Sequence, residues 1–183
     1  MRAALAAGLW NPQTNDGMAP RMGETARPIA AIVLAAGKGT RMKSELHKVL
    51  HPIAGRPMID HLLASLGELS PARTVVIVGQ GREQLESHLT ARAEIAVQDP
   101  QLGTGHAVQQ AEGALAGFDG DVLVLYGDVP FVRPDTMRAM IERLRADDQP
   151  QVVVLGFAPE DTLQYGRGIA EDGRIAKMLE YKD

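Results

Sequence analysis

Short apolar runs alternate with stretches of helical periodicity along most of this chain, and that alternation constrains the fold more than any other feature. Five runs are typical of strands, at residues 29–35, 74–78, 94–97, 121–126 and 151–157. The first, IAAIVLA, is continuously apolar, as expected of a strand buried on both faces of a sheet. Helical patterns occupy residues 57–66, 83–91, 106–115 and 134–145.

Strands that alternate with helices predict βαβ crossovers and a mainly parallel sheet covered on both faces. The end of the chain differs, because residues 168–170 and 174–181 flank Glu171-Asp172-Gly173, which is a hairpin signal. We therefore predict a three-layer α/β/α sandwich of Rossmann-like type with an appended β-hairpin. The 183 residues suit one domain, at residues 28–183, preceded by a flexible extension at residues 1–27.

Composition excludes several functions. The net charge of -4 gives no basic field for nucleic acid, so any bound anion needs a local site. The absence of cysteine excludes disulfides, thiolate metal sites and cysteine nucleophiles, and it fits a cytoplasmic protein. No apolar stretch is long enough to span a membrane. The short apolar run at residues 3–10 lacks a cleavage site, so secretion is not expected.

The loop after the first strand has the composition of a phosphate site. Gly37 and Gly39 let the backbone turn sharply and approach a ligand with its N–H groups exposed. Positive side chains cluster there in a chain that is acidic overall, namely Lys38, Arg41, Lys43 and Lys48. A strand, a glycine loop and clustered cations predict a triphosphate cradle at the carboxyl edge of the sheet.

Glycines at this spacing also occur in other kinds of loop. Gly-x-Gly alone fits a plain tight turn with no ligand. Met42 stands where a dinucleotide-binding motif would have its third glycine, and the Gly-Lys-[Ser/Thr] of a Walker A loop is absent. Both of those nucleotide sites are therefore disfavoured.

Two further landmarks carry polar groups that suit a nucleotide. Gln98 and Gln101 precede a glycine turn, and each amide offers the donor and the acceptor that a nucleobase edge requires. A polar loop with Thr104 as helix N-cap explains the same residues without a ligand. Asp128 follows the strand at residues 121–126, where a carboxylate is well placed to hold Mg²⁺, although such residues also serve as turn formers.

These landmarks together resemble the sugar-nucleotide pyrophosphorylases. LAAGKGTRM at residues 34–42, then Ser44 and HKVL at 47–50, is similar to the family's L-A-A-G-x-G-T-R-M, S and P-K-V-L. QDPQLGTGHA at 98–107 resembles the Q-x-x-Q-L-G-T-[AG]-H-A of the uridylyltransferases that make UDP-N-acetylglucosamine. LYGDVP at 125–130 is similar to L-x-G-D-x-P. Tyr165-Gly166-Arg167 and Glu180 resemble the sugar pocket's Y-G-R and I-V-E-x-K-D.

The resemblance implies a role for each matched position. The nucleotide is expected on Leu34, Ala35, Ala36, Gly37, Gly39, Lys48, Gln98, Gln101, Gly103 and Thr104, with uracil or ribose on the last four. Arg41 would bind the departing phosphates, Lys48 would neutralise the α-phosphate and sugar phosphate, and Asp128 would bind Mg²⁺. Tyr126, Gly166 and Glu180 would line the sugar site, whereas His106 is expected to be structural.

The activity implied is transfer of UMP from UTP to N-acetylglucosamine 1-phosphate, giving UDP-N-acetylglucosamine and pyrophosphate for peptidoglycan and lipopolysaccharide synthesis. Two alternatives stay open. One is a related nucleotidyltransferase for another sugar phosphate or a molybdenum cofactor. The other is a nucleotide-binding module without turnover.

Three departures from the family pattern are expected to matter. His47 replaces the proline that fixes the loop before the lysine, which would loosen the placement of Lys48. Gly168 stands where a branched apolar residue is usual. The family domain also continues beyond Asp183, with two asparagines and, in the bifunctional bacterial enzyme, an acetyltransferase domain. We expect weak turnover at most, no acetyltransferase activity, and homo-oligomers only through such C-terminal parts.

Overall fold

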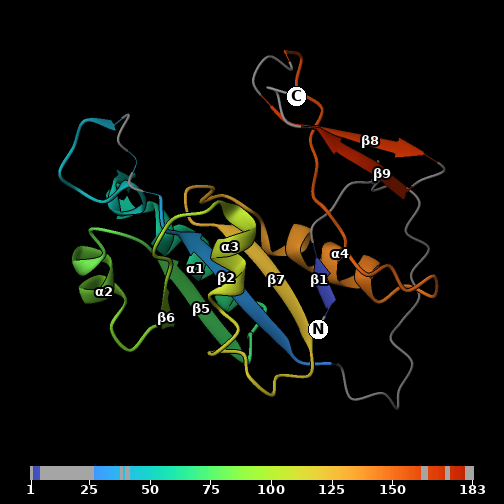
Figure 1. Cartoon of the computed structure of the whole chain (residues 1–183), viewed down its shortest axis with the longest axis horizontal. Helices are drawn as coiled ribbons and strands as arrows, with labels where there is room; N and C mark the ends of the chain where they lie inside the picture. Colours follow the sequence, from blue (N-terminus) through green and yellow to red (C-terminus); the bar gives the residue numbers. More distant parts are fainter. Residues whose placement is uncertain are drawn as a thin grey trace.

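The structure of the chain is a computed structural model that describes residues 2–4, 27–37, 39, 42–161, 165–171 and 174–179. Its centre is a five-stranded sheet in the order β1-β7-β2-β5-β6, in which every neighbouring pair is parallel (Figure 1). The strands are β1 (Arg2–Ala4), β2 (Ile29–Ala35), β5 (Arg73–Val78), β6 (Glu94–Val97) and β7 (Asp121–Tyr126).

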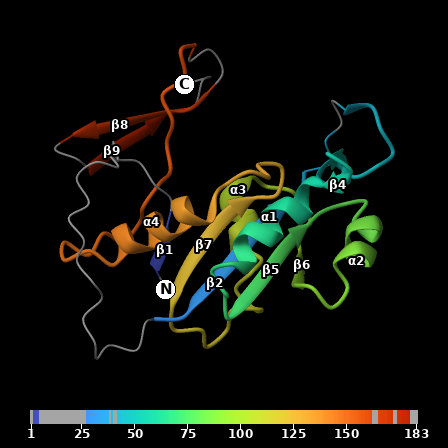
Figure 2. The same ribbon diagram turned by 180° about the vertical axis from the view of Figure 1, so that it is seen from behind.

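Helices cover both faces of this sheet, because successive strand residues point to opposite sides. On one face, Ala31, Val33 and Ala35 of β2 pack with α1 (Met58–Gly67), α2 (Glu83–Leu89) and α4 (Pro134–Leu144). On the other face, Ala30 and Ile32 pack with α3 (Thr104–Gln109) and the turns that follow it. Figures 1 and 2 show the two layers on either side of the sheet. The predicted three-layer α/β/α sandwich is confirmed.

Smaller elements complete the described chain. A 3₁₀ turn, η2 (Lys48–Leu50), leads into a short hairpin of β3 (Pro52–Ile53) and β4 (Arg56–Pro57). A second hairpin, β8 (Arg167–Glu171) with β9 (Arg174–Leu179), forms where the sequence predicted one and stands away from the main sheet (Figures 1 and 2). Within the described residues, no helix combines the length and apolar character needed to cross a bilayer.

The strand predicted at residues 151–157 is wrong. Only a single bridge residue, Val152, occurs there, and Val153 alone is buried in the core. A strand needs a neighbouring edge to supply hydrogen-bond partners, and the edge of β7 that faces away from β2 is paired with β1. Arg2–Ala4, inside the predicted N-terminal extension, thus forms a strand that the sequence pattern did not indicate.

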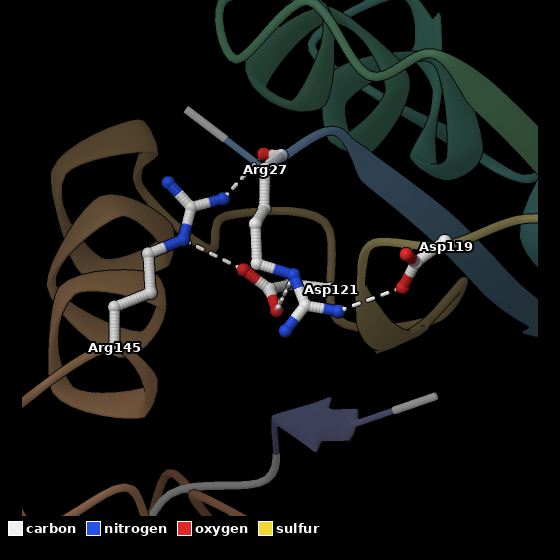
Figure 3. Close-up of polar contacts among 4 residues, drawn as sticks. All are labelled: Arg27, Asp119, Asp121 and Arg145. Atoms are coloured by element: carbon white, nitrogen blue, oxygen red, sulfur yellow. Dashed lines mark hydrogen bonds and ion pairs between the residues drawn. The ribbon is translucent and has the colours of Figure 1, made fainter. Parts of the chain in front are cut away.

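The amino end of β7 is held by a network of charged side chains (Figure 3). Asp121 is 2% exposed, and its Oδ2 accepts a hydrogen bond of 2.6 Å from Arg145 Nε. Arg145 also donates to the carbonyl oxygen of Arg27, whose guanidinium donates to Asp119. The network joins α4 to the segments that enter β2 and β7, which fixes the two central strands at the end opposite their carboxyl termini.

Chain order reverses direction at β2. From β2 the chain moves outward through β5 to β6, and then returns past β2 to form β7 on its other side. In open α/β sheets, ligands bind in the crevice outside the carboxyl ends of the strands at such a switch point. The topology therefore directs attention to the loops that follow β2, β6 and β7.

Candidate functional site

A cavity of about 570 Å³ lies at this switch point. It is lined by residues that the sequence had singled out from three loops and strand ends: Leu34, Ala35, Ala36, Gly37, Gly39, Lys48, Gln98, Gln101, Gly103, Thr104, Tyr126 and Asp128. Met42, Val49 and Ala107 complete the lining and had not been predicted. Arg41 and Glu180 lie outside the described residues, and Gly166 is described but does not line the cavity.

The glycine loop exposes backbone to the cavity. Gly37 is exposed, and a Cβ added there would meet no atom within 4 Å, so there is open space beside the loop. Gly39 has a φ of +62°, in the left-handed region, and a Cβ there would lie 2.6 Å from Lys48 Cβ. Glycine at this position therefore serves two purposes, because it permits the turn and lets the stem of Lys48 pack against the loop.

Lys48 Nζ and Asp128 Oδ2 form an ion pair across the cavity, and their side chains are 36% and 33% exposed. Asp128 reaches this position because β7 and β2 approach closely at their ends. The N–H of Gly127 donates to the carbonyl oxygen of Leu34, and a Cβ at Gly127 would lie 3.1 Å from that oxygen. One cation and one carboxylate thus share the mouth of the switch point.

A single carboxylate such as Asp128 suits a divalent cation that the phosphates of a bound substrate would also hold. No cluster of three or more His, Cys, Asp or Glu side chains occurs within the described part of the chain. Mg²⁺ commonly uses one or two carboxylates together with substrate phosphates and water. One carboxylate would therefore suit a cation that phosphate oxygens also hold, and in the structure this carboxylate is paired with Lys48.

Gln98 presents a fixed amide to the cavity although its side chain is 3% exposed. Its Nε2 donates to the carbonyl oxygen of Gly103 at 2.8 Å and lies 3.2 Å from His106 Nδ1. The carbonyl of Gly103 can only accept, which fixes the orientation of the amide. Oε1 of Gln98 has no protein donor among the described residues, so it is available to a ligand N–H.

Gln101 contacts the glycine loop in the structure. Its Nε2 donates a hydrogen bond to the carbonyl oxygen of Ala36, which joins the loop after β6 to the loop after β2. The sequence had predicted a contact between Gln101 and uracil or ribose. The geometry gives one N–H of the amide a protein partner and leaves the second N–H and Oε1 for a ligand.

His47 holds the segment before Lys48 in a way that the sequence did not indicate. Its φ of -57° is one that proline would also adopt, and its N–H donates to Gln84 Oε1 at 3.0 Å. Gln84 in turn donates to the carbonyl oxygen of Glu45. The imidazole is buried with both ring nitrogens unpartnered, and burial lowers the pKa of His47. Hydrogen bonds thus replace the ring constraint of the family proline.

The landmarks for a sugar pocket are only partly brought together. Tyr126 lines the cavity and is 47% exposed. Tyr165, next to Gly166, packs edge to face against Phe157 with ring centroids 4.8 Å apart. Most of the residues predicted to bind the nucleotide thus line one cavity, whereas Tyr126 is the one described residue of the predicted sugar site that lines it.

Known proteins resemble this chain in sequence. Residues 31–171 match the family described as "MobA-like NTP transferase domain". The chain is 76% identical over 156 residues to "Bifunctional protein GlmU" of Novosphingobium aromaticivorans, covering 85% of this chain and 35% of that protein. It is 70% identical to the protein of the same name from Sphingopyxis alaskensis, with the same coverage of both chains. The chain thus spans about a third of the length of these curated relatives.

Solved structures share the fold. A nucleotidyl transferase from Methanothermobacter (Mth528) superposes with a TM-score of 0.53 at 26% identity, covering 63% of this chain and 57% of that one. A putative glucose-1-phosphate thymidylyltransferase from Bacillus anthracis gives a TM-score of 0.62 at 20% identity, covering 84% and 64% respectively. At 20% identity, the similarity to the second structure shows a shared fold and nothing more.

Proposed function

The chain belongs to the MobA-like NTP transferase family, and we propose that it transfers UMP from UTP to N-acetylglucosamine 1-phosphate, releasing pyrophosphate. One observation carries the proposal: a glycine loop, a lysine–aspartate pair and an oriented glutamine amide line a single cavity. The high identity to bifunctional GlmU proteins supports the choice of this substrate pair.

In the proposed reaction the protein positions two polyanions that repel each other and neutralises the charge that develops on the phosphates. The exposed backbone at Gly37 and Gly39 receives the triphosphate. Lys48 leaves Asp128 and takes the α-phosphate and the sugar phosphate. No protein side chain has to remove a proton, because a sugar phosphate is already ionised at neutral pH.

A divalent cation, which we propose to be Mg²⁺, would be held by Asp128 and phosphate oxygens. When bound, it supplies positive charge to the triphosphate. Arg41 completes the proposed phosphate contacts, and Gly166 and Glu180 complete the proposed sugar contacts. These three assignments rest on the family resemblance.

The proposed base is uracil because the free acceptor of Gln98 suits a ring N–H. Uracil presents an N–H at ring position 3, whereas cytosine presents an acceptor there, which would face Oε1 of Gln98 unfavourably. Thymine shares the N–H with uracil, so the amide alone does not separate these two bases. Comparison of UTP, CTP and dTTP therefore tests the amide and the rest of the cavity separately.

The same site also supports a second candidate, a module that binds the nucleotide without turnover. The observation that favours it is the position of Gly166, which the structure does not place in the cavity. This candidate shares the cradle and the base contact with the first. It differs in lacking productive binding of the sugar phosphate.

The test is pyrophosphate release from UTP, N-acetylglucosamine 1-phosphate and MgCl₂, with CTP, GTP and dTTP and with other sugar 1-phosphates in parallel. Asp128→Asn and Lys48→Met serve as site variants. Release that requires this sugar, UTP and both side chains supports the enzyme. Calorimetric binding of UTP without release supports the binding module, and the absence of both would refute the two candidate functions together.

A further inference from the structure

Gly79 stands at the carboxyl end of β5, directly after Val78, and no motif assigns it a role. Strand β5 lies between β2 and β6 in the sheet (Figure 1). Gln101, in the loop after β6, must therefore extend across the end of β5 to reach Ala36, in the loop after β2. Its side chain passes directly over Gly79.

The space above Gly79 is filled by the two ends of this hydrogen bond. A Cβ at Gly79 would lie 2.2 Å from Gln101 Nε2 and 2.5 Å from the carbonyl oxygen of Ala36. Contacts that short do not persist in proteins, so one or both partners would have to move. Gly79 has no φ in the left-handed region, and the requirement for glycine is therefore one of space.

We propose that Gly79 is a positioning residue of the nucleotide site, since its lack of a side chain permits the hydrogen bond from Gln101 to Ala36, hereafter the Gln101–Ala36 clasp. The inference rests on the proposed function and extends it to a residue that does not line the cavity. Both ends of the clasp do line the cavity, so its loss would move two parts of the wall.

The clasp matters because the loop at residues 99–103 has few other attachments. All five of its residues are exposed, Leu102 at 69%. Gly103 accepts hydrogen bonds from the Gln98 side chain and from the backbone N–H of Ala107, so within residues 99–102 the clasp is the one side-chain anchor recorded among the described residues. A preformed loop spares the ligand the entropic cost of ordering it. Small displacements of positioning groups can also lower rates by about 100-fold.

Gly79→Ala is therefore expected to raise the KM for UTP by about tenfold, with a smaller effect on kcat, because loop order is recovered once the ligand is bound. Gln101→Ala is expected to produce a similar increase without adding any atom. The double variant should be no worse than Gly79→Ala alone, since both changes remove the same clasp. Gly113→Ala is the matched control, because a Cβ there meets nothing within 4 Å.

Backbone hydrogen exchange of the ligand-free protein tests the clasp even if UTP is not a substrate. Exchange at residues 36–39 and 99–103 should accelerate in Gly79→Ala and in Gln101→Ala, while β2 and β5 remain protected and the Gly113→Ala control is unchanged. If wild type neither binds nor turns over UTP, the proposed function fails, whereas the exchange data still decide whether the clasp exists.

The proposal is overturned if Gly79→Ala changes neither exchange nor KM. It is overturned equally if exchange accelerates while KM is constant, because the clasp would then not position the nucleotide. Effects of the two single changes that multiply in the double variant would show that Gly79 acts independently of Gln101. Should Gly79→Ala fail to fold, Gln101→Ala with the same two readouts carries the test.

Discussion

Lys48 and Asp128, which are 80 residues apart in the chain, form an ion pair between the loop after β2 and the end of β7. In the proposed reaction they serve different partners, Lys48 the phosphates and Asp128 a divalent cation. In the structure, the positive charge of Lys48 and the negative charge of Asp128 thus neutralise each other. The proposed reaction therefore requires the pair to separate when the nucleotide and the cation bind.

Removal of Lys48 should strengthen metal binding to the nucleotide-free protein. In Lys48→Met, Asp128 loses its cationic partner, so the affinity for Mn²⁺, measured by electron paramagnetic resonance, should rise several-fold. Turnover should fall by about 100-fold or more, because a charge that stabilises the transition state is lost. Lys177→Met, which removes an equivalent charge from β9, outside the lining of the cavity, is the control. Equal metal affinities in Lys48→Met and wild type would contradict this competition.

Asp128→Asn should abolish most turnover while preserving the fold. The amide has nearly the same shape but no charge with which to hold a cation. We expect kcat to decrease by about 10²- to 10³-fold, in the range seen when one charge-stabilising group is removed. Pyrophosphate release provides the measurement, and Asp119→Asn, with a side chain that is 95% exposed, provides the control. Retained activity in Asp128→Asn would remove Asp128 from the proposed site.

Arg145→Ala should destabilise the protein. Asp121 is buried and would lose the donor that lies 2.6 Å from its Oδ2 (Figure 3). Arg27 Nε stays 4.0 Å from Oδ1 of Asp121, so we expect a loss of about 2 kcal/mol in the free energy of unfolding, less than the roughly 3 kcal/mol for a buried carboxylate with no partner. Arg138→Ala, which breaks exposed ion pairs to Asp135 and Glu68, should cost under about 1 kcal/mol. Urea titrations of both variants measure the difference, and similar losses would contradict the assigned importance of Asp121.

The stability of the protein should depend on His47 as the pH falls. Burial lowers the pKa of His47, so below the ordinary histidine value of about 6.5 the unfolded chain binds more protons than the folded one. This difference reduces the free energy of unfolding by at most about 1.4 kcal/mol per pH unit as the pH decreases from 7.

The variant His47→Leu removes the titration and both unpartnered ring nitrogens. The free energy of unfolding of the variant, minus that of the wild type, should therefore increase as the pH is lowered from 7 to 5. Urea unfolding at each pH measures both free energies. Other groups titrate in both proteins and largely cancel in the difference. A difference that is constant over this range would show that His47 does not couple folding to protonation.

Much of the fold was predictable from the sequence because the central strands are mostly buried. The runs at residues 29–35 and 121–126 coincide with β2 and β7, since nearly continuous apolar residues leave few alternatives, and the run at 94–97 coincides with β6 although no residue of β6 is buried. The run at 151–157 looked equally apolar yet forms no strand. Its outcome depended on which segment pairs with the outer edge of β7, and that choice is not encoded within the run.

Most of the residues that line the candidate cavity could also be predicted from motifs, whereas the hydrogen bonds between those residues could not. Motif positions give the residue types that gather at the carboxyl edge of a parallel sheet. The clasp joins residues 65 positions apart, and its passage over Gly79 follows only from the order of β2, β5 and β6. A lone glycine after a strand offers no such signal.

The position of β7 has a consequence for how the protein acquires its site. Strands β2, β5 and β6 are joined by local crossovers, but after β6 the chain must return past β5 and β2 to place β7 at the other edge of β2. An early folding intermediate that contained only β2, β5 and β6 would expose one edge of β2 to association with other chains. In that intermediate Asp128, which follows β7, would not yet be placed in the site. We expect metal-dependent nucleotide binding to be recovered during refolding only after this last strand docks. Stopped-flow refolding with a fluorescent UTP analogue would then time the closure of the sheet.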